Sequence, residues 1–119
     1  DCVMVSNAAY SKLTVKKVPA FMSQDIVTKL LREELGFDGI VMTSPLNDNV
    51  IENNYTNEFA VVEAVKAGCD LIVLPGNFKE CYEALITAVE EGRIDEKVIN
   101  TSVRRILQNK IQRGILVLE

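Results

Sequence analysis

The side chains that could carry chemistry in this chain are carboxylates, hydroxyls, amides and thiols, because the sequence contains no histidine. Without an imidazole, a Ser-His-Asp or Cys-His nucleophile, a His general base and a His-ligated metal are excluded within these residues. Acid–base work therefore falls to the 17 Asp and Glu residues, to Tyr or to Lys. The sequence also has no GxGxxG, GxxxxGK(S/T) or HExxH motif. We expect no metal site and no cofactor.

The cysteines Cys2, Cys69 and Cys81 are too widely spaced for a disulfide framework or a CxxC metal site. A zinc site would need Cys and carboxylate ligands alone. We interpret all three as buried or half-buried thiols, which favours a reducing compartment such as the cytoplasm.

Length and composition indicate at most one folded domain. The chain has 119 residues, of which 48% are apolar and 25% charged, the balance of a globular protein. Its formal net charge of −4 argues against nucleic acid as a partner. No apolar stretch approaches the roughly 18 residues of a membrane span. The N-terminus has neither an initiator Met nor the basic residues of a signal peptide, so we expect the chain to begin inside a longer protein.

Short apolar runs alternate along the chain with segments of helical period. The runs predict buried strands at Cys2–Ser6, Gly39–Thr43 and Leu71–Leu74, the last ended by Pro75. Helices are predicted from the N-cap Ser23 to Leu35, over Asn57–Ala67, through Tyr82–Val89 and from the cap Asp95 to Lys110, with Gly36, Gly68, Gly92 and Gly114 after them. Irregular loops are predicted for Asn7–Met22 and Asn47–Asn54.

This order of elements predicts an α/β fold with parallel strands and outer helices. An open doubly wound sheet and part of a (β/α)8 barrel both fit the pattern. In either architecture, ligands bind at the carboxyl ends of the strands, here Ser6-Asn7, Thr43-Ser44-Pro45 and Leu74-Pro75-Gly76. A flavodoxin-like receiver would need several Asp residues at these ends, and the sequence does not supply them.

Two motifs, Leu30–Val41 (LLREELGFDGIV) and Glu63–Leu71 (EAVKAGCDL), resemble glycoside hydrolase family 3, in particular its bacterial β-N-acetylhexosaminidase branch. Val18–Ser23, Leu74–Gly76 and Ser102–Leu107 extend the similarity, in the same order, over essentially the whole chain. The resemblance implies a TIM-like (β/α)8 barrel of about 250 residues, of which this chain would be the last three βα units. Residues 1–119 would then be a single fragment or partial domain.

The resemblance also implies retaining hydrolysis of terminal β-linked N-acetylglucosamine, in which a carboxylate attacks the anomeric carbon and a second group protonates the leaving oxygen. In this branch the proton donor is a His held by an Asp upstream of these residues, so this chain does not supply it. The nucleophile position falls in Thr43-Ser44-Pro45-Leu46, where the family has an Asp in place of Ser44. Asn7 stands where the family usually has a His.

We interpret Asn7, Ser44 and Asn47 as residues that would bind the sugar, and we expect no intact catalytic residue in the chain. A Ser hydroxyl is a poor replacement for a carboxylate when no base adjoins it. Asp48 could be recruited as the nucleophile, but a displaced carboxylate loses the in-line geometry of attack.

Charged residues of the predicted helices are interpreted as surface. Arg32, Glu33 and Glu34 fall on the polar face of their helix, which we expect to be solvated. Arg104 and Arg105 fit either helix surface or barrel-closing ion pairs.

Two functions stay open at this point. The chain is either part of a family 3 glycosidase whose other part supplies the donor, or an inactive homologue that binds carbohydrate or is structural. We expect no hydrolysis by the chain alone. Parallel strands cut from a barrel have open edges and an apolar inner face, so we expect self-association or pairing with the missing barrel portion. The side chains that would face water are Val3, Val5, Ile40, Met42, Ile72 and Leu74.

Overall fold

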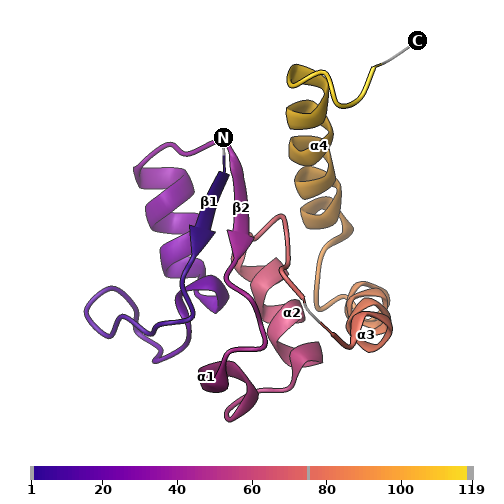
Figure 1. Cartoon of the computed structure of the whole chain (residues 1–119). Helices are drawn as coiled ribbons and strands as arrows, with labels where there is room; N and C mark the ends of the chain where they lie inside the picture. The colour runs from indigo at the N-terminus through magenta and orange to yellow at the C-terminus, as the bar shows by residue number, and fades with distance from the viewer. Residues whose placement is uncertain (1, 75, 118–119) are drawn as a thin grey trace.

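The computed structural model describes residues 2–74 and 76–117, and it has helices packed around a short parallel sheet (Figure 1). The elements are β1 (Cys2–Val5), the 3₁₀-helix η1 (Ala20–Met22), the π-helix η2 (Asp25–Glu34), β2 (Ile40–Thr43), α1 (Asn49–Glu52), α2 (Asn57–Ala67), α3 (Phe78–Glu90) and α4 (Glu96–Gln112). The predicted α/β fold with parallel strands is confirmed. No helix within the described ranges is long and apolar enough to cross a membrane.

β1 and β2 form a parallel pair, in register from Cys2 opposite Ile40 to Val5 opposite Thr43. Both strands run towards α1 in Figure 1. β1 is only partly buried, because it pairs along one edge: Val5 is buried, whereas Cys2 and Met4 are exposed. The prediction that this strand is buried is therefore wrong for these two residues, as is the prediction of a buried or half-buried Cys2 thiol.

A third strand over Leu71–Leu74, and with it the set of three βα units, is not confirmed. Among the described residues of that segment, only Leu71 joins the ladder, as an isolated parallel bridge to Met42. Thr43 explains the interruption, because its side-chain Oγ1 accepts the N–H of Val73 at 3.1 Å where a backbone carbonyl would continue the ladder. Pro75, which we expected to end this strand, lies outside the described residues.

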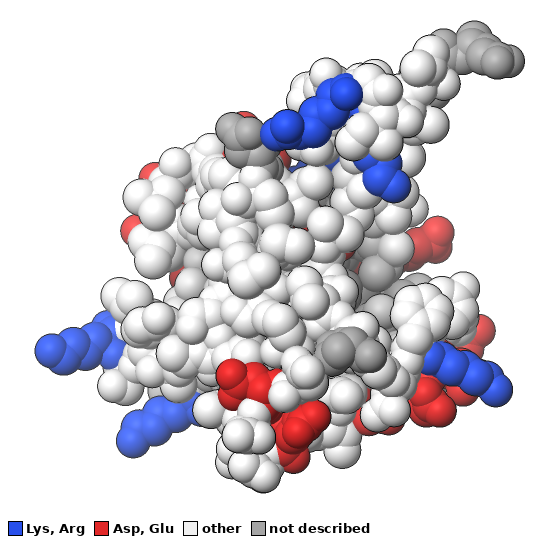
Figure 2. All heavy atoms as spheres, in the orientation of Figure 1, with Lys and Arg blue, Asp and Glu red and all other residues white. Residues whose placement is uncertain are grey.

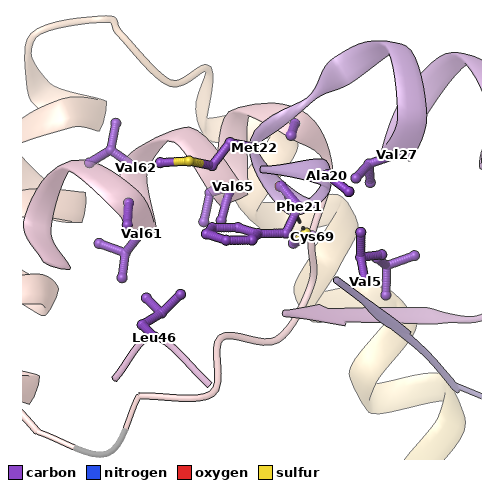
Figure 3. Close-up of a cluster of buried hydrophobic side chains, with 14 of the residues drawn as sticks. Val5, Ala20, Phe21, Met22, Val27, Leu46, Val61, Val62, Val65 and Cys69 are labelled. Atoms are coloured by element: carbon purple, nitrogen blue, oxygen red, sulfur yellow. Dashed lines mark hydrogen bonds between the residues drawn. The ribbon is translucent and has the colours of Figure 1, made fainter. Parts of the chain in front are cut away.

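The core is centred on Phe21, whose side chain is fully buried. Figure 3 shows its ring lying among Met22 and the α2 side chains Val61 and Val65. The Sγ of Cys69 donates a hydrogen bond of 3.4 Å to the Phe21 carbonyl. The prediction of an irregular loop over Asn7–Met22 is wrong for its last turn, because burial of these apolar side chains fixes η1 there.

Glycines end four helices, as the sequence predicts. Gly36, Gly68, Gly92 and Gly114 all have positive φ, the left-handed conformation that closes a helix. The predicted helix start after Ser23 is confirmed: Ser23 is extended, residue 24 is helical, and the Ser23 carbonyl accepts the backbone N–H groups of Ile26 and Val27, with η2 following from Asp25.

The polar segment Asn47–Asn54 was predicted to be irregular, and it contains the short helix α1. The carboxylate of Asp48 accepts the N–H of Val50 at 2.8 Å, which satisfies a free donor at the start of the helix. Ile51 is completely buried, so one turn of helix is stabilised by a tertiary contact that composition does not reveal.

None of the six apolar side chains that were predicted to face water is fully exposed. Val5 and Ile40 are buried, and Val3, Met42, Ile72 and Leu74 are half-buried. Large exposed apolar side chains include Met4 of β1, several residues of the 10–15 segment, and residues of α2, α3 and α4.

Candidate functional site

A hollow of about 680 Å³ lies at the carboxyl ends of β1 and β2, where ligands bind in parallel α/β folds. It brings together all three predicted site residues, Asn7, Ser44 and Asn47. The complete described lining is Ser6, Asn7, Ala8, Ser44, Pro45, Asn47, Asp48 and Val50. The third predicted strand end contributes no described residue to it.

Two side-chain hydrogen bonds cross between the strand ends inside this hollow. Ser44 Oγ donates to the carbonyl of Val5 at 3.1 Å, and the same carbonyl also accepts the Ser44 backbone N–H at 3.0 Å. In the opposite direction, Asn7 Nδ2 donates to the carbonyl of Pro45 at 3.1 Å. The hydroxyl and the amide therefore hold the two strand ends together while they line the hollow.

One polar atom of the hollow has no protein partner. Asn7 Oδ1 is buried and accepts no hydrogen bond from any described residue. A buried acceptor without a donor carries a free-energy cost, which a donor from a ligand or a water would remove. Asn7 Nδ2 is held by the Pro45 carbonyl, so Oδ1 is the atom of this side chain whose acceptor capacity is unused.

Asp48 supplies the one ionisable side chain of the described lining. Its Oδ1 is already an acceptor for the Val50 N–H at the start of α1. Asn47 precedes it and is exposed. No group of three or more His, Cys, Asp or Glu side chains within residues 2–74 and 76–117 could hold a metal ion.

These groups can make neutral hydrogen bonds but are poorly arranged for covalent chemistry. The proton of Ser44 is directed at the Val5 carbonyl, which is not a base, so nothing in the described lining activates the hydroxyl as a nucleophile. Amide, hydroxyl and backbone groups in a small hollow suit a neutral, hydroxyl-rich ligand.

A charged cluster that sequence reasoning missed lies near the opposite end of β2. The side chain of Asp70 is fully buried and forms ion pairs with Arg32, at 2.6 Å, and with Arg105, at 3.0 Å. Its Oδ2 also accepts the N–H of Val41. The prediction that Arg32 is solvated is wrong, because its carboxylate partner lies in the distant segment EAVKAGCDL. Arg105 does form an ion pair, and its proposed part in closing a barrel stays a prediction.

Comparisons with known proteins agree with this fold and with the motifs. The profile described as "Glycosyl hydrolase family 3 N terminal domain" matches residues 1–109. A glycoside hydrolase family 3 β-N-acetylglucosaminidase from Paenibacillus sp. str. FPU-7 is 36% identical, with a TM-score of 0.91, over 100% of this chain and 24% of that one. The β-N-acetylglucosaminidase from Thermotoga maritima is 31% identical, with a TM-score of 0.82, over 90% of this chain and 24% of that one.

Curated relatives include two kinds of glycosidase. A β-glucosidase from Rhizobium radiobacter is 37% identical over 82 residues, which are 69% of this chain and 9% of the relative. A β-hexosaminidase A from Pseudoalteromonas piscicida is 28% identical in an alignment 127 positions long, which covers 91% of this chain and 21% of the relative. The chain thus spans less than a quarter of the length of each of these proteins. With the family profile matched over most of its length, the chain belongs to glycosyl hydrolase family 3 and corresponds to part of the N-terminal domain of that family.

Proposed function

We propose that this chain is part of a family 3 barrel of the β-N-acetylhexosaminidase type, and that it binds carbohydrate without hydrolysing it. The observation that carries this proposal is the hydrogen bond made by the Ser44 hydroxyl. This residue occupies the position that the resemblance gives to the nucleophile, and its hydroxyl donates to the Val5 carbonyl.

Retaining hydrolysis needs a carboxylate on one side of the glycosidic bond and a proton donor on the other. In this hollow the nucleophile position holds the neutral hydroxyl of Ser44. Asp48 is the one carboxylate of the described lining, so the lining does not provide both a nucleophile and a proton donor. Losing the nucleophile or the donor of a catalytic pair costs many powers of ten in rate.

Binding is better supported than catalysis. Asn7 Oδ1 is an unused buried acceptor, which suits the hydroxyl or amide N–H of an N-acetylated sugar. Asn47 and Ser44 add polar groups around the same hollow. The solved β-N-acetylglucosaminidases at 36% and 31% identity cover 100% and 90% of this chain, whereas the 37% identical β-glucosidase covers 69%, so the wider similarity favours N-acetylglucosamine over glucose as the sugar.

A second candidate is hydrolysis with Asp48 as the nucleophile, and the observation in its favour is that Asp48 lines the same hollow. Against it, one oxygen of this carboxylate accepts the Val50 N–H and thereby holds the start of α1. Turning the side chain towards a sugar would remove that cap.

Amide NMR of the 119-residue chain with increasing N-acetylglucosamine tests the binding. We expect saturable shifts at residues 6–8 and 44–50, weakened by Asn7→Ala but not by the control Asn100→Ala on the exposed face of α4. The absence of shifts there, or equal effects of the two variants, would contradict binding at this hollow.

An assay with an aryl β-N-acetylglucosaminide tests the absence of catalysis. We expect no turnover. A rate within a hundredfold of an ordinary glycosidase, on the order of 10 s⁻¹, would show that the chain retains hydrolytic chemistry. If Asp48→Asn then abolished that rate, the second candidate would replace the first.

A further inference from the structure

The hydrogen bonds between β2 and the Leu71–Leu74 segment follow a regular parallel ladder for two steps and then depart from it. Leu71 N–H donates to the Val41 carbonyl at 3.1 Å, and Thr43 N–H donates to the Leu71 carbonyl at 3.0 Å. In such a ladder the donors alternate between the two strands and advance evenly along them. A regular continuation would therefore bind Val73 N–H to the Thr43 carbonyl, and then the N–H of residue 45 to the Val73 carbonyl.

Neither of these two bonds is present between the described residues. Val73 N–H donates to the side-chain Oγ1 of Thr43 at 3.1 Å instead of to its carbonyl. Residue 45 is a proline, which has no N–H to donate. The next donor along the chain, Leu46 N–H, bonds to the Val73 carbonyl at 3.2 Å. The end of β2 thus accommodates one extra residue, which is the geometry of a β-bulge.

The burial of the side chains follows this extra residue. Val41 and Thr43 are completely buried, as expected for alternate residues of a strand that face the core. Alternation would direct residue 45 to the core as well, but Pro45 is exposed and Leu46 is completely buried instead. The bulge therefore leaves two successive residues, Ser44 and Pro45, on the side of the hollow, and both belong to its lining.

We propose that Thr43 is a positioning residue for the hollow: its hydroxyl fixes the bulge, and the bulge places Ser44 and the residues after it for contact with a ligand. Thr43 is 0% exposed and lies outside the lining, so it acts through its neighbours. Because the ligand is the N-acetylated sugar of the proposed function, this role rests on that function. Bulges next to binding sites commonly re-aim side chains in this way.

The hydroxyl is the required group because it gives Val73 N–H an acceptor outside the ladder. If a methyl group replaced it, Val73 N–H would either stay unpaired, which is costly, or return to the backbone carbonyl of residue 43. The Leu46–Val73 bond would move in both cases. That bond holds one side of the 43–46 turn, whereas the Ser44 bonds to the Val5 carbonyl hold the other side.

A neutral sugar is the suitable probe for the hollow. β2 points towards α1 in Figure 1, and Figure 2 shows acidic side chains gathered at this lower end of the molecule, around α1. Asp48 belongs to the lining, and Glu52 lies on α1. An anionic sugar would be repelled there, so we choose N-acetylglucosamine.

Amide NMR of the 119-residue chain and of three variants tests the positioning. Thr43→Val keeps the branched shape of the side chain and removes the hydroxyl, whereas Thr43→Ser keeps the hydroxyl. The matched control Val41→Ala removes buried side-chain atoms at the preceding core position of β2 and deletes no side-chain hydrogen bond. Circular dichroism and urea denaturation show whether each variant is folded and how much stability it has lost.

We expect Thr43→Val to disturb the hollow both without and with sugar. Without sugar, Leu46 N–H should exchange faster with solvent, and the side-chain amide signal of Asn7, which donates to the Pro45 carbonyl, should move. With sugar, the dissociation constant should rise about tenfold, the equivalent of one hydrogen bond. Thr43→Ser should bind nearly as tightly as the unchanged chain. Val41→Ala should lose stability and keep its affinity.

Pro45→Ala approaches the same bulge from its other side. It supplies the N–H that the regular ladder lacks at position 45, so residue 45 can take over the Val73 carbonyl. Leu46 N–H should then lose its protection from exchange, although no hydrogen-bonding group has been removed from the chain. This variant decides the case if Thr43→Val does not fold, and unchanged protection of Leu46 would contradict the bulge.

Three results would overturn the positioning role. Thr43→Val could leave the Leu46 exchange, the Asn7 signal and the affinity unchanged, Thr43→Ser could be impaired as much as Thr43→Val, or Val41→Ala could weaken binding equally. If N-acetylglucosamine causes no shifts in the unchanged chain, the proposed function is contradicted instead. The Leu46 and Asn7 signals of the sugar-free variants then decide the positioning role by themselves.

Discussion

Arg32 and Asp70 form an ion pair of 2.6 Å between Nη2 and Oδ2, although 38 residues separate them in sequence. Their side chains are 11% and 0% exposed. Arg32 also donates to the carbonyls of Phe37 and Gly39, and the second oxygen of Asp70 accepts from Arg105. One buried carboxylate therefore joins η2, the start of β2 and α4.

Asp70→Asn should lower the free energy of unfolding by about 3 kcal/mol, because it leaves the buried Arg32 guanidinium without its counter-charge. Urea denaturation at fixed protein concentration measures the loss. The control Glu83→Gln breaks an exposed pair on α3 and should change the midpoint little. Equal effects of the two substitutions would show that the buried pair is not a stabilising contact.

Cys69 should make stability fall at high pH. Burial, with the Asp70 carboxylate as a smaller cause, raises the pKa of this thiol from 9.0 to about 12. The folded chain therefore holds the thiol proton more tightly than the unfolded chain. The resulting stabilisation is complete below pH 9 and is lost as pH rises towards about 12. Urea midpoints measured across this range should fall less steeply in Cys69→Ala; parallel curves would contradict the assignment.

Thiol labelling should separate the three cysteines by burial. Cys2 is exposed, whereas Cys69 and Cys81 are buried. Burial also raises the pKa of Cys81. At pH 8 a thiol reagent should therefore modify Cys2 rapidly and the other two slowly, since the thiolate is the reactive form. In urea all three should react, and mass spectrometry of peptides identifies each site. Rapid native labelling of Cys69 would contradict its placement in the core.

Gly68→Ala should destabilise the chain more than Gly36→Ala. Both glycines have positive φ, which costs an L-residue roughly 1–2 kcal/mol. At Gly68 an added Cβ would also lie 2.9 Å from Thr28 Oγ1, whereas at Gly36 it would meet nothing within 4 Å. Thr28 Oγ1 cannot easily move, because it donates to the Ala67 carbonyl at 2.8 Å. Thermal unfolding of both variants gives the comparison, and a larger loss at Gly36 would contradict this explanation.

Ser44→Asp should not create a hydrolase. The new carboxylate would be an acceptor beside the Val5 carbonyl, also an acceptor, and the described lining of the hollow would still hold no proton donor. Ser44→Ala should cost about 1 kcal/mol of stability through the lost hydrogen bond to Val5, and Ser44→Asp should cost more. An aryl β-N-acetylglucosaminide assay and urea denaturation test the two parts. Appreciable turnover by Ser44→Asp would show that a donor is present.

Features that depend on neighbouring residues could be read from the sequence alone. The glycine that follows η2, α2, α3 and α4 is one example, because a left-handed helix end is a local backbone requirement that Gly meets without strain. The alternation of apolar runs and amphipathic segments gave the α/β fold, and two motifs were enough to suggest the family. The meeting of Asn7 with Ser44 also followed from the rule that parallel strands end on the same side of a sheet.

Tertiary structure decided the features that depend on residues far apart in the chain. The position of Arg32 in the helical period is that of a solvated residue on the polar face. Its side chain is nevertheless buried, because it pairs with Asp70 in the folded chain. The hydroxyl of Thr43 interrupts the third strand by binding the N–H of Val73, and burial of Ile51 stabilises α1 within a segment of turn-forming residues. Sequence periodicity records only the neighbours of a residue along the chain. The partners Arg32 and Asp70 are 38 residues apart in sequence, and Thr43 and Val73 are 30 apart. Only the folded chain brings such residues into contact, so only the folded chain reveals these hydrogen bonds.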